Sequence, residues 1–74
     1  MKIQVKLYGE FLKYGPEESY VELRDNSTVD DLLKRVSITE RAYIIVQINQ
    51  KRSSFEDKLE DNDTVSIFAP VGGG

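Results

Sequence analysis

The sequence contains neither cysteine nor histidine. Without cysteine the chain can form no disulfide bond, and it offers no thiolate ligand, no cysteine nucleophile and no persulfide of its own. Histidine is the commonest general base and metal ligand, so its absence removes the usual route to side-chain catalysis. We therefore expect a protein that is not itself an enzyme and that holds no metal and no tightly bound cofactor.

The sequence also lacks a surplus of basic residues and a long apolar run, and these absences bear on which partners the protein binds. The chain has 10 basic and 13 acidic residues, so it has no basic surplus with which to bind the phosphates of nucleic acids. It also has no apolar run long enough to span a membrane and no signal-peptide pattern. We expect a cytoplasmic protein that binds neither nucleic acid nor membrane. Its 74 residues suffice for one domain with a small core.

Alternating apolar and polar residues predict strands with one buried face. The pattern occurs in four segments, at residues 2–8, 20–23, 43–48 and 64–68. We expect the most apolar of them, 43–48, to be the central strand, and residues 51–53 to add a short strand after a turn. Between the first two strands, Phe11, Leu12 and Tyr14 are expected to hold a loop against the core.

Residues 28–36 combine the signals of an amphipathic helix. Thr28 is a good N-cap, and Asp31 three residues later completes a capping-box pattern. Asp30 and Asp31 are placed to pair with Lys34 and Arg35 one turn further on, which accounts for the two adjacent aspartates without a metal site. The apolar residues form one stripe: Val29, Leu32, Leu33 and Val36. Residues 37–42 fit either a further helical turn or a loop.

A helix with one apolar stripe requires one sheet face to cover, which predicts an α+β fold with a mixed sheet of about four or five strands. The other face should remain open to solvent. By alternation, that open face carries Gln4, Lys6, Tyr8, Ile45, Gln47, Ser66 and Phe68. Three of these, Tyr8, Ile45 and Phe68, are apolar or aromatic residues on an otherwise polar surface, and we predict that they form a partner interface.

The chain ends in Ala69-Pro70-Val71-Gly72-Gly73-Gly74. Pro70 stiffens the exit from the last strand, while the three glycines carry no side chain that would obstruct entry into a narrow enzyme slot. Fully extended, residues 71–74 would reach roughly 13 Å. Such a tail suits a protein whose terminal carboxylate is itself the reagent. A frayed end or an expression scar is the alternative.

Four segments, in their order and in their spacing from the end of the chain, resemble the sulfur-carrier branch of the ubiquitin-like proteins, above all the small subunit of molybdopterin synthase. The first, residues 1–7, resembles the opening strand of ubiquitin itself, and the other three resemble the small subunit: Val46–Asn49, Leu59–Val65 and Phe68–Gly74. Two positions depart from that family. Asn62 stands where glycine is usual, although asparagine tolerates the same positive φ. Ala69-Pro70 stands where a double proline is usual, which leaves the tail slightly looser.

The resemblance implies a β-grasp domain at residues 1–70 and a flexible glycine tail at 71–74. It implies that an adenylating enzyme of the ubiquitin-activating type uses ATP to activate the Gly74 carboxylate, and that sulfur from a persulfide-bearing donor protein converts it to a thiocarboxylate. Val71, Gly72 and Gly73 would thread the tail into the partner, with Pro70 at its base. The larger subunit of molybdopterin synthase would then receive the sulfur for molybdopterin, or for its tungsten counterpart.

Other functions fit the same tail. Related carriers deliver sulfur to the thiazole of thiamine or to tRNA, and ubiquitin-like modifiers attach their last glycine to lysines of target proteins. A β-grasp interaction module with an idle tail is a third possibility. Removal of Gly73 and Gly74 would leave such a module functional, whereas either form of terminal chemistry would be lost.

Overall fold

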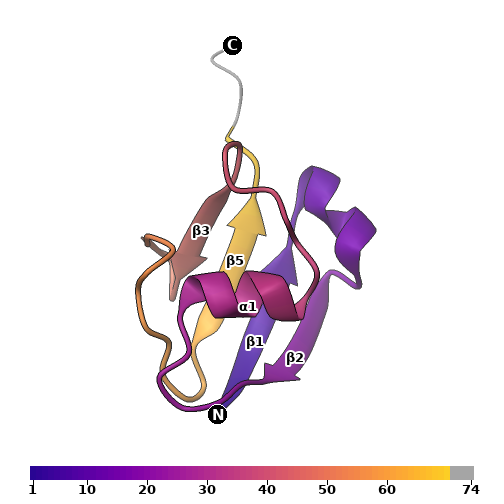
Figure 1. Cartoon of the computed structure of the whole chain (residues 1–74). Coiled ribbons are helices and arrows are strands. Elements are labelled where there is room, and N and C mark those ends of the chain that lie inside the picture. Colours follow the sequence, from indigo (N-terminus) through magenta and orange to yellow (C-terminus); the bar gives the residue numbers. More distant parts are fainter. Residues whose placement is uncertain (71–74) are drawn as a thin grey trace.

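The computed structural model describes residues 1–70 and shows one mixed sheet covered by one helix (Figure 1). The elements follow the order β1 (Lys2–Leu7), the 3-10 helix η1 (Gly9–Tyr14), β2 (Glu18–Glu22), α1 (Val29–Arg35), β3 (Ile45–Ile48), β4 (Lys51–Arg52) and β5 (Thr64–Phe68). Strand order in the sheet is β2-β1-β5-β3-β4, with β1 and β5 parallel and the other neighbours antiparallel. This is the predicted α+β class and the β-grasp arrangement.

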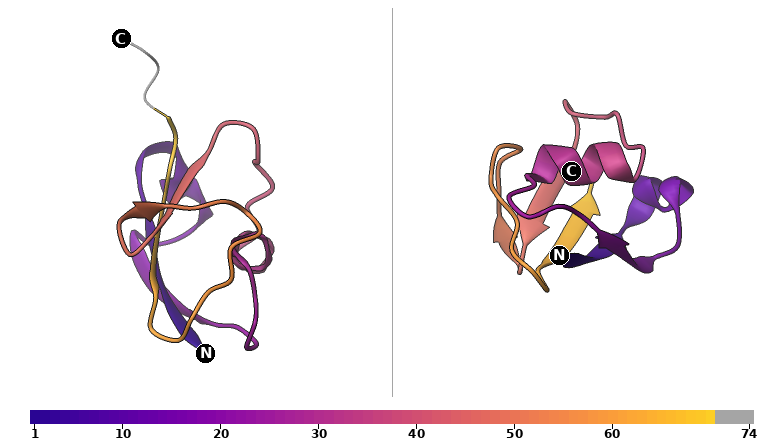
Figure 2. Two further views of the ribbon diagram at one scale, coloured as in Figure 1. Left: turned by 90° about the vertical axis from the view of Figure 1, so that its left-hand side faces the viewer. Right: turned by 60° about the horizontal axis from the view of Figure 1, so that its bottom comes forward.

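The helix lies on one face of the sheet only, as the two further views show (Figure 2). Between them lies a core of aliphatic side chains and one phenylalanine, with Ile3, Val65 and Ile67 fully excluded from solvent. The predicted stripe of α1 contributes Val29, Leu32 and Leu33 to this core, while Val36 at the helix end is half-buried. Alternation therefore assigned the inward face of the strands correctly.

The centre of the sheet differs from the prediction. β5, not β3, lies in the middle, because it pairs with β1 on one side and with β3 on the other. β3 begins only at Ile45, and its outer neighbour β4 is two residues long. The apolar character of residues 43–48 comes from packing against the core rather than from a central place in the sheet, since Ile44 is buried without belonging to a strand.

The predicted loop between β1 and β2 contains the 3-10 helix η1. Phe11 is buried and Tyr14 stacks on it with ring centroids 5.9 Å apart, as expected for a segment held against the core. Leu12 was wrongly assigned to that contact, because it is 46% exposed. A short 3-10 turn can direct only part of its surface inward, and Phe11 already occupies that side.

Capping and turn residues behave as their chemistry dictates. Thr28 Oγ1 accepts from the N–H of Asp31, and Asp31 Oδ2 accepts from the N–H of Thr28, which completes the capping box. Asn62, with φ of 71°, adopts the left-handed conformation expected of it. Asn49 and Gln50 are also left-handed, and they form the tight connection from β3 to β4.

Candidate functional site

The apolar end of the open face is built from three strands that converge where the chain leaves the sheet. Ile45 is the register partner of Phe68, so their side chains share the face opposite the helix. Tyr8 directly follows β1, and its ring meets that of Phe68 edge-on, with centroids 6.2 Å apart and planes at 88°. The structure thus brings together the three residues that the alternation placed on one surface.

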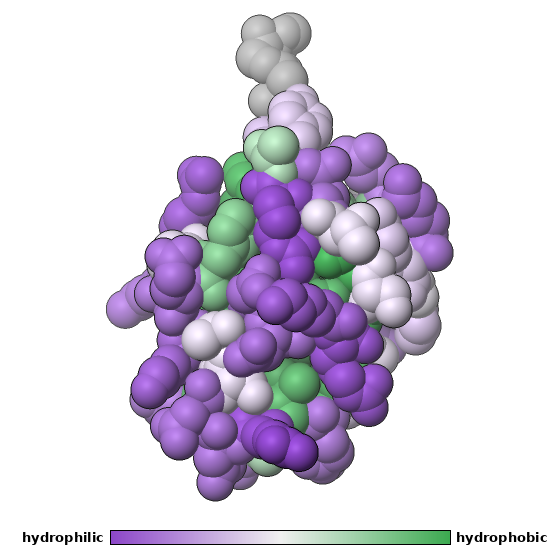
Figure 3. Space-filling model, in the orientation of Figure 1, coloured by the Kyte–Doolittle hydropathy of each residue, from purple (hydrophilic) through white to green (hydrophobic). Residues whose placement is uncertain are grey.

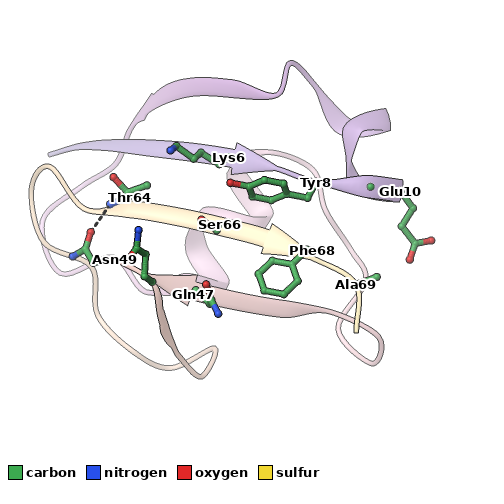
Figure 4. Close-up of a pocket in the computed structure, with 11 residues that line it drawn as sticks. Lys6, Tyr8, Glu10, Gln47, Asn49, Thr64, Ser66, Phe68 and Ala69 are labelled. Carbon is green, nitrogen blue, oxygen red and sulfur yellow. Dashed lines mark hydrogen bonds between the residues drawn. The ribbon is translucent and has the colours of Figure 1, made fainter. Parts of the chain in front are cut away.

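A shallow groove of about 740 Å³ runs along this face (Figure 4). Tyr8, Phe68 and Ala69 line its apolar end, and Gln47, Ser66 and Lys6 line its polar part. Ile45 is half-buried and does not line the groove itself, although it belongs to the same face. Tyr8 remains 43% exposed. The groove therefore offers an aromatic end next to a surface of amides and hydroxyls.

Two polar side chains at the groove, those of Thr64 and Asn49, already have hydrogen-bond partners within the protein. Thr64 Oγ1 donates to the Gln4 side-chain oxygen at 3.1 Å, and the N–H of Thr64 donates to Asn49 Oδ1 at 2.9 Å. Asn49 also donates from its amide to Asp63 at 2.9 Å. Since Thr64 and Asn49 are engaged in this way, a partner gains more by covering the aromatic end than by contacting these two side chains. The helix side, by contrast, is mostly hydrophilic (Figure 3).

β5 ends at Phe68, so the chain leaves the sheet beside the Tyr8–Phe68 pair. Ala69 packs against the core and Pro70 is half-buried, so the direction in which the chain leaves the domain is fixed up to Pro70. The remaining predicted site residues, Val71, Gly72, Gly73 and Gly74, lie outside the described residues. Sequence and structure together therefore define the surface around the root of the tail and leave the tail itself as a prediction.

Residues 37–42, which fit either a helical turn or a loop by sequence, form a loop that continues to residue 44 and is held by Arg41. Its guanidinium donates to Asp30 at 2.8 Å and to the carbonyls of Ile38 and Glu40 at 2.6 and 2.9 Å. Arg41 also lies over the ring of Phe55 at 5.8 Å. The predicted pairing of Asp30 with Lys34 is confirmed at 3.1 Å.

Two carboxylates of this region titrate below their usual range. The hydrogen bond from Arg41, followed by that from Lys34, lowers the pKa of Asp30 below its usual 3.8. Hydrogen bonds from the backbone N–H groups of Tyr43 and Ala42 lower the pKa of Glu40 below 4.5. The predicted pair of Asp31 with Arg35 is not formed among the described residues, because Asp31 is turned back into the capping box.

Within residues 1–70, no three acidic side chains lie together in a way that could hold a metal ion. No helix of this part of the chain is long and apolar enough to cross a membrane. The surface around the root of the tail thus offers aromatic contact and hydrogen bonds, which suits recognition of another protein.

Residues 5–74 match the model of the ThiS family, so that the similarity includes the glycine tail. Comparison with curated proteins gives no significant match. The extent of the family match, nearly the whole chain, agrees with the extent of the fold described above.

Solved structures share the fold along the full length of the domain. SAMP1 from Haloferax volcanii has a TM-score of 0.84 at 20% identity, with 100% of both chains covered. A Pyrococcus furiosus protein described as molybdopterin converting factor subunit 1 has a TM-score of 0.84 at 26% identity, with 96% of this chain and 99% of that chain covered. A chain from the complex of subunits 1 and 2 of the Helicobacter pylori molybdopterin-converting factor has a TM-score of 0.70 at 19% identity, with both chains covered at 100%.

Proposed function

Because this chain belongs to the ThiS family of ubiquitin-like sulfur carriers, we propose that it carries sulfur as a thiocarboxylate on Gly74. The observation on which the proposal rests is that the family match continues through the final glycine, together with the uncovered aromatic surface at the root of the tail. Members of this family are small carrier proteins, so the catalytic groups belong to the partners. The absence of cysteine and histidine from the chain fits that division of labour.

The proposed chemistry begins with activation of a poor electrophile. One Gly74 carboxylate oxygen attacks the α-phosphorus of ATP, pyrophosphate leaves, and an acyl-adenylate forms within the adenylating enzyme. The terminal sulfur of a donor protein's persulfide then attacks the acyl carbon and AMP leaves, giving an acyl disulfide. A thiol reduces that disulfide, becoming oxidised to a disulfide itself, and releases the thiocarboxylate. This group is the stronger nucleophile that the acceptor requires.

Each part of the surface has a proposed role in that sequence. Pro70 sets the direction of the tail, Val71 enters the partner's slot, and Gly72 and Gly73 pass through its narrow part, where side chains beyond Cα would collide. Phe68 and Tyr8 dock against the partner, with Ile45 beside them, because they are the aromatic and apolar groups that the sheet leaves at least partly accessible at this end. We thus treat residues 1–70 as the recognition domain and 71–74 as the reagent.

For the acceptor, we propose molybdopterin or its tungsten counterpart, with this chain as the small subunit of the synthase. The support is the 26% identity with the Pyrococcus furiosus protein described as molybdopterin converting factor subunit 1, over nearly all of both chains. The same fold occurs in the Helicobacter pylori complex of two such subunits, which supports a partner protein for this chain. Delivery to thiamine or tRNA remains the alternative within the same chemistry.

Removal of Gly74 tests whether the terminal carboxylate is the reagent. The chain that ends at Gly73, and separately the Gly74→Ala variant, should melt at the same temperature as the unmodified chain but lose ATP-dependent pyrophosphate release with the adenylating enzyme. The loss should exceed about a hundredfold, because the reacting carbon is displaced from the active site. Undiminished pyrophosphate release by the shortened chain would refute the proposal.

A protein-modifier role is the second candidate, because the fold is shared with SAMP1, whose name stands for small archaeal modifier protein 1. In that case the acyl-adenylate reacts with a lysine amine of a target protein and leaves an isopeptide bond. Expression of a tagged chain, followed by denaturing purification, distinguishes the two roles. Conjugates of higher mass that disappear with the Gly74 deletion would favour the modifier, while a free chain bearing sulfur would favour the carrier.

A further inference from the structure

A third aromatic side chain, besides Tyr8 and Phe68, lies close to the root of the tail, on the loop between α1 and β3. Tyr43 is 48% exposed, although Ile44 next to it is buried. Ile45 is the antiparallel register partner of Phe68. Tyr43 lies two residues before Ile45 and Pro70 lies two residues after Phe68, so the chain positions of Tyr43 and Pro70 correspond across the two strands. Figure 1 and the left view of Figure 2 place this loop at the end of the molecule where the chain leaves β5.

The conformation of this loop is held by hydrogen bonds of Arg41 and Glu40. Arg41 donates to the carbonyls of Ile38 and Glu40 and to Asp30 on α1, and its guanidinium covers the ring of Phe55. The Glu40 carboxylate accepts from the backbone N–H groups of Ala42 and Tyr43, both at 2.8 Å. These bonds therefore hold the backbone that leads into Tyr43, while its ring remains partly exposed.

The length of the tail limits where an enzyme that holds Gly74 can be. Residues 71–74 span at most roughly 13 Å, so the enzyme must approach the domain closely around Pro70. Groups displayed within that distance are covered when the tail is bound. A rigid aromatic residue is well suited to such a contact, because its ring contributes a large area at a small entropic cost.

We infer that Tyr43, held in place by Arg41 and Glu40, is a docking contact for the adenylating enzyme that takes up the tail. The inference rests on the proposed function, since it supposes that such an enzyme binds Gly74. Tyr43 makes the contact through its ring, and Arg41 acts as a positioning residue. The enzyme would then contact the domain at two places near Pro70, the Tyr8–Phe68 pair and the 37–44 loop.

Steady-state ATP–pyrophosphate exchange tests the contact, with a purified adenylating enzyme of the ubiquitin-activating class and the full chain as varied substrate. Tyr43→Ser should raise the KM for the chain about tenfold and leave kcat unchanged, because docking is weakened while the tail chemistry is intact. Tyr43→Phe should remain within about twofold of the unmodified chain, since the ring is preserved. The matched control is Tyr20→Ser, which removes a still more exposed ring at the outer strand β2 and should change KM less than about twofold.

The positioning role of Arg41 has its own signature. Arg41→Met should raise KM by a smaller factor than Tyr43→Ser, and the double variant should behave like Tyr43→Ser alone, because Arg41 acts only through the ring that it positions. Additive effects would refute the positioning role. Thermal melting of each variant verifies that the effects on KM do not come from unfolding.

The outcomes separate this inference from the proposed function. If the unmodified chain gives no exchange with any enzyme of the class, both the proposed function and the docking contact fall. If it gives exchange but Tyr43→Ser and Tyr20→Ser have the same KM, only the docking contact is refuted. A selective KM effect at Tyr43 supports both.

Discussion

The two faces of the sheet are formed by alternate residues of the same strands, yet they are built for different purposes. On β5, Val65 and Ile67 point to the helix and are fully buried, whereas Ser66 and Phe68 point to the open face and remain partly accessible. The first set loses all contact with water on folding, and the second loses only part. Stability and recognition are thus interleaved one residue apart, and substitutions at neighbouring positions can separate them.

The largest effect is expected from shortening a core side chain. Ile67→Ala should lower the free energy of unfolding by about 3 kcal/mol, since it removes buried methyl groups and leaves a cavity in a small core. Ser66→Ala, its neighbour on the other face, should change it by less than about 0.5 kcal/mol. Urea denaturation measures both. Similar losses at the two positions would contradict the division of the faces.

Placing a charge on the open face should weaken partner binding strongly and lower the stability of the fold only slightly. Phe68→Asp and Ile45→Asp should weaken binding to the adenylating enzyme about tenfold or more. Phe68→Asp should cost about 1 kcal/mol of stability, mainly through loss of the edge-on contact with Tyr8. Tyr20→Asp, on the same face but far from the aromatic end, serves as the control for added charge. A collapse of the melting temperature with Ile45→Asp would show that Ile45 is part of the core.

A smaller effect is expected where the helix that covers the core begins. Thr28→Ala should cost about 1 kcal/mol, because the N–H of Asp31 loses its acceptor and the capping box is broken. Thr39→Ala, at an exposed loop position, should be nearly neutral. Equal thermal stability of the two variants would mean that the cap contributes nothing to holding the helix on the sheet.

The smallest effect is a pH dependence on the helix side. Because the pKa of Asp30 is lower in the folded protein than its usual 3.8, its ionised form stabilises the fold above that value, and the contribution is lost as pH falls through the folded pKa. Asp30→Asn should therefore melt below the unmodified protein at pH 7, and the two melting temperatures should converge as the pH falls below 3.8. A gap that stays constant with pH would contradict this assignment.

Local patterns predicted what depends on local chemistry. Alternation identified the inward residues of the strands, and the Thr28–Asp31 spacing identified the capping box. The position of β5 at the centre of the sheet could not be read from the sequence, because it depends on which distant strand each hydrogen-bonding edge meets. The 3-10 form of residues 9–14 was missed for a related reason, since burial of Phe11 decides it.

The candidate site divides in the same way. Tyr8, Ile45 and Phe68 were found because alternation and the apolar character of three outward positions suffice. Arg41 and Tyr43 were missed, because the contact of Arg41 with Asp30 joins a loop residue to the helix, and the conformation of that loop had no sequence signal. An arginine that follows a helical aspartate in the sequence is common, so its presence alone does not predict that the two residues bond and fix the loop between them.

The central claim is that the terminal carboxylate exchanges an oxygen for sulfur. The most direct test is the intact mass of the full chain after incubation with ATP, an adenylating enzyme, a persulfide donor and a thiol. We predict a gain of about 16 Da, confined to the peptide that contains Gly74 and absent from the chain that ends at Gly73. An unchanged mass, with the chain instead attached to lysines of other proteins, would contradict the sulfur-carrier account and favour the modifier.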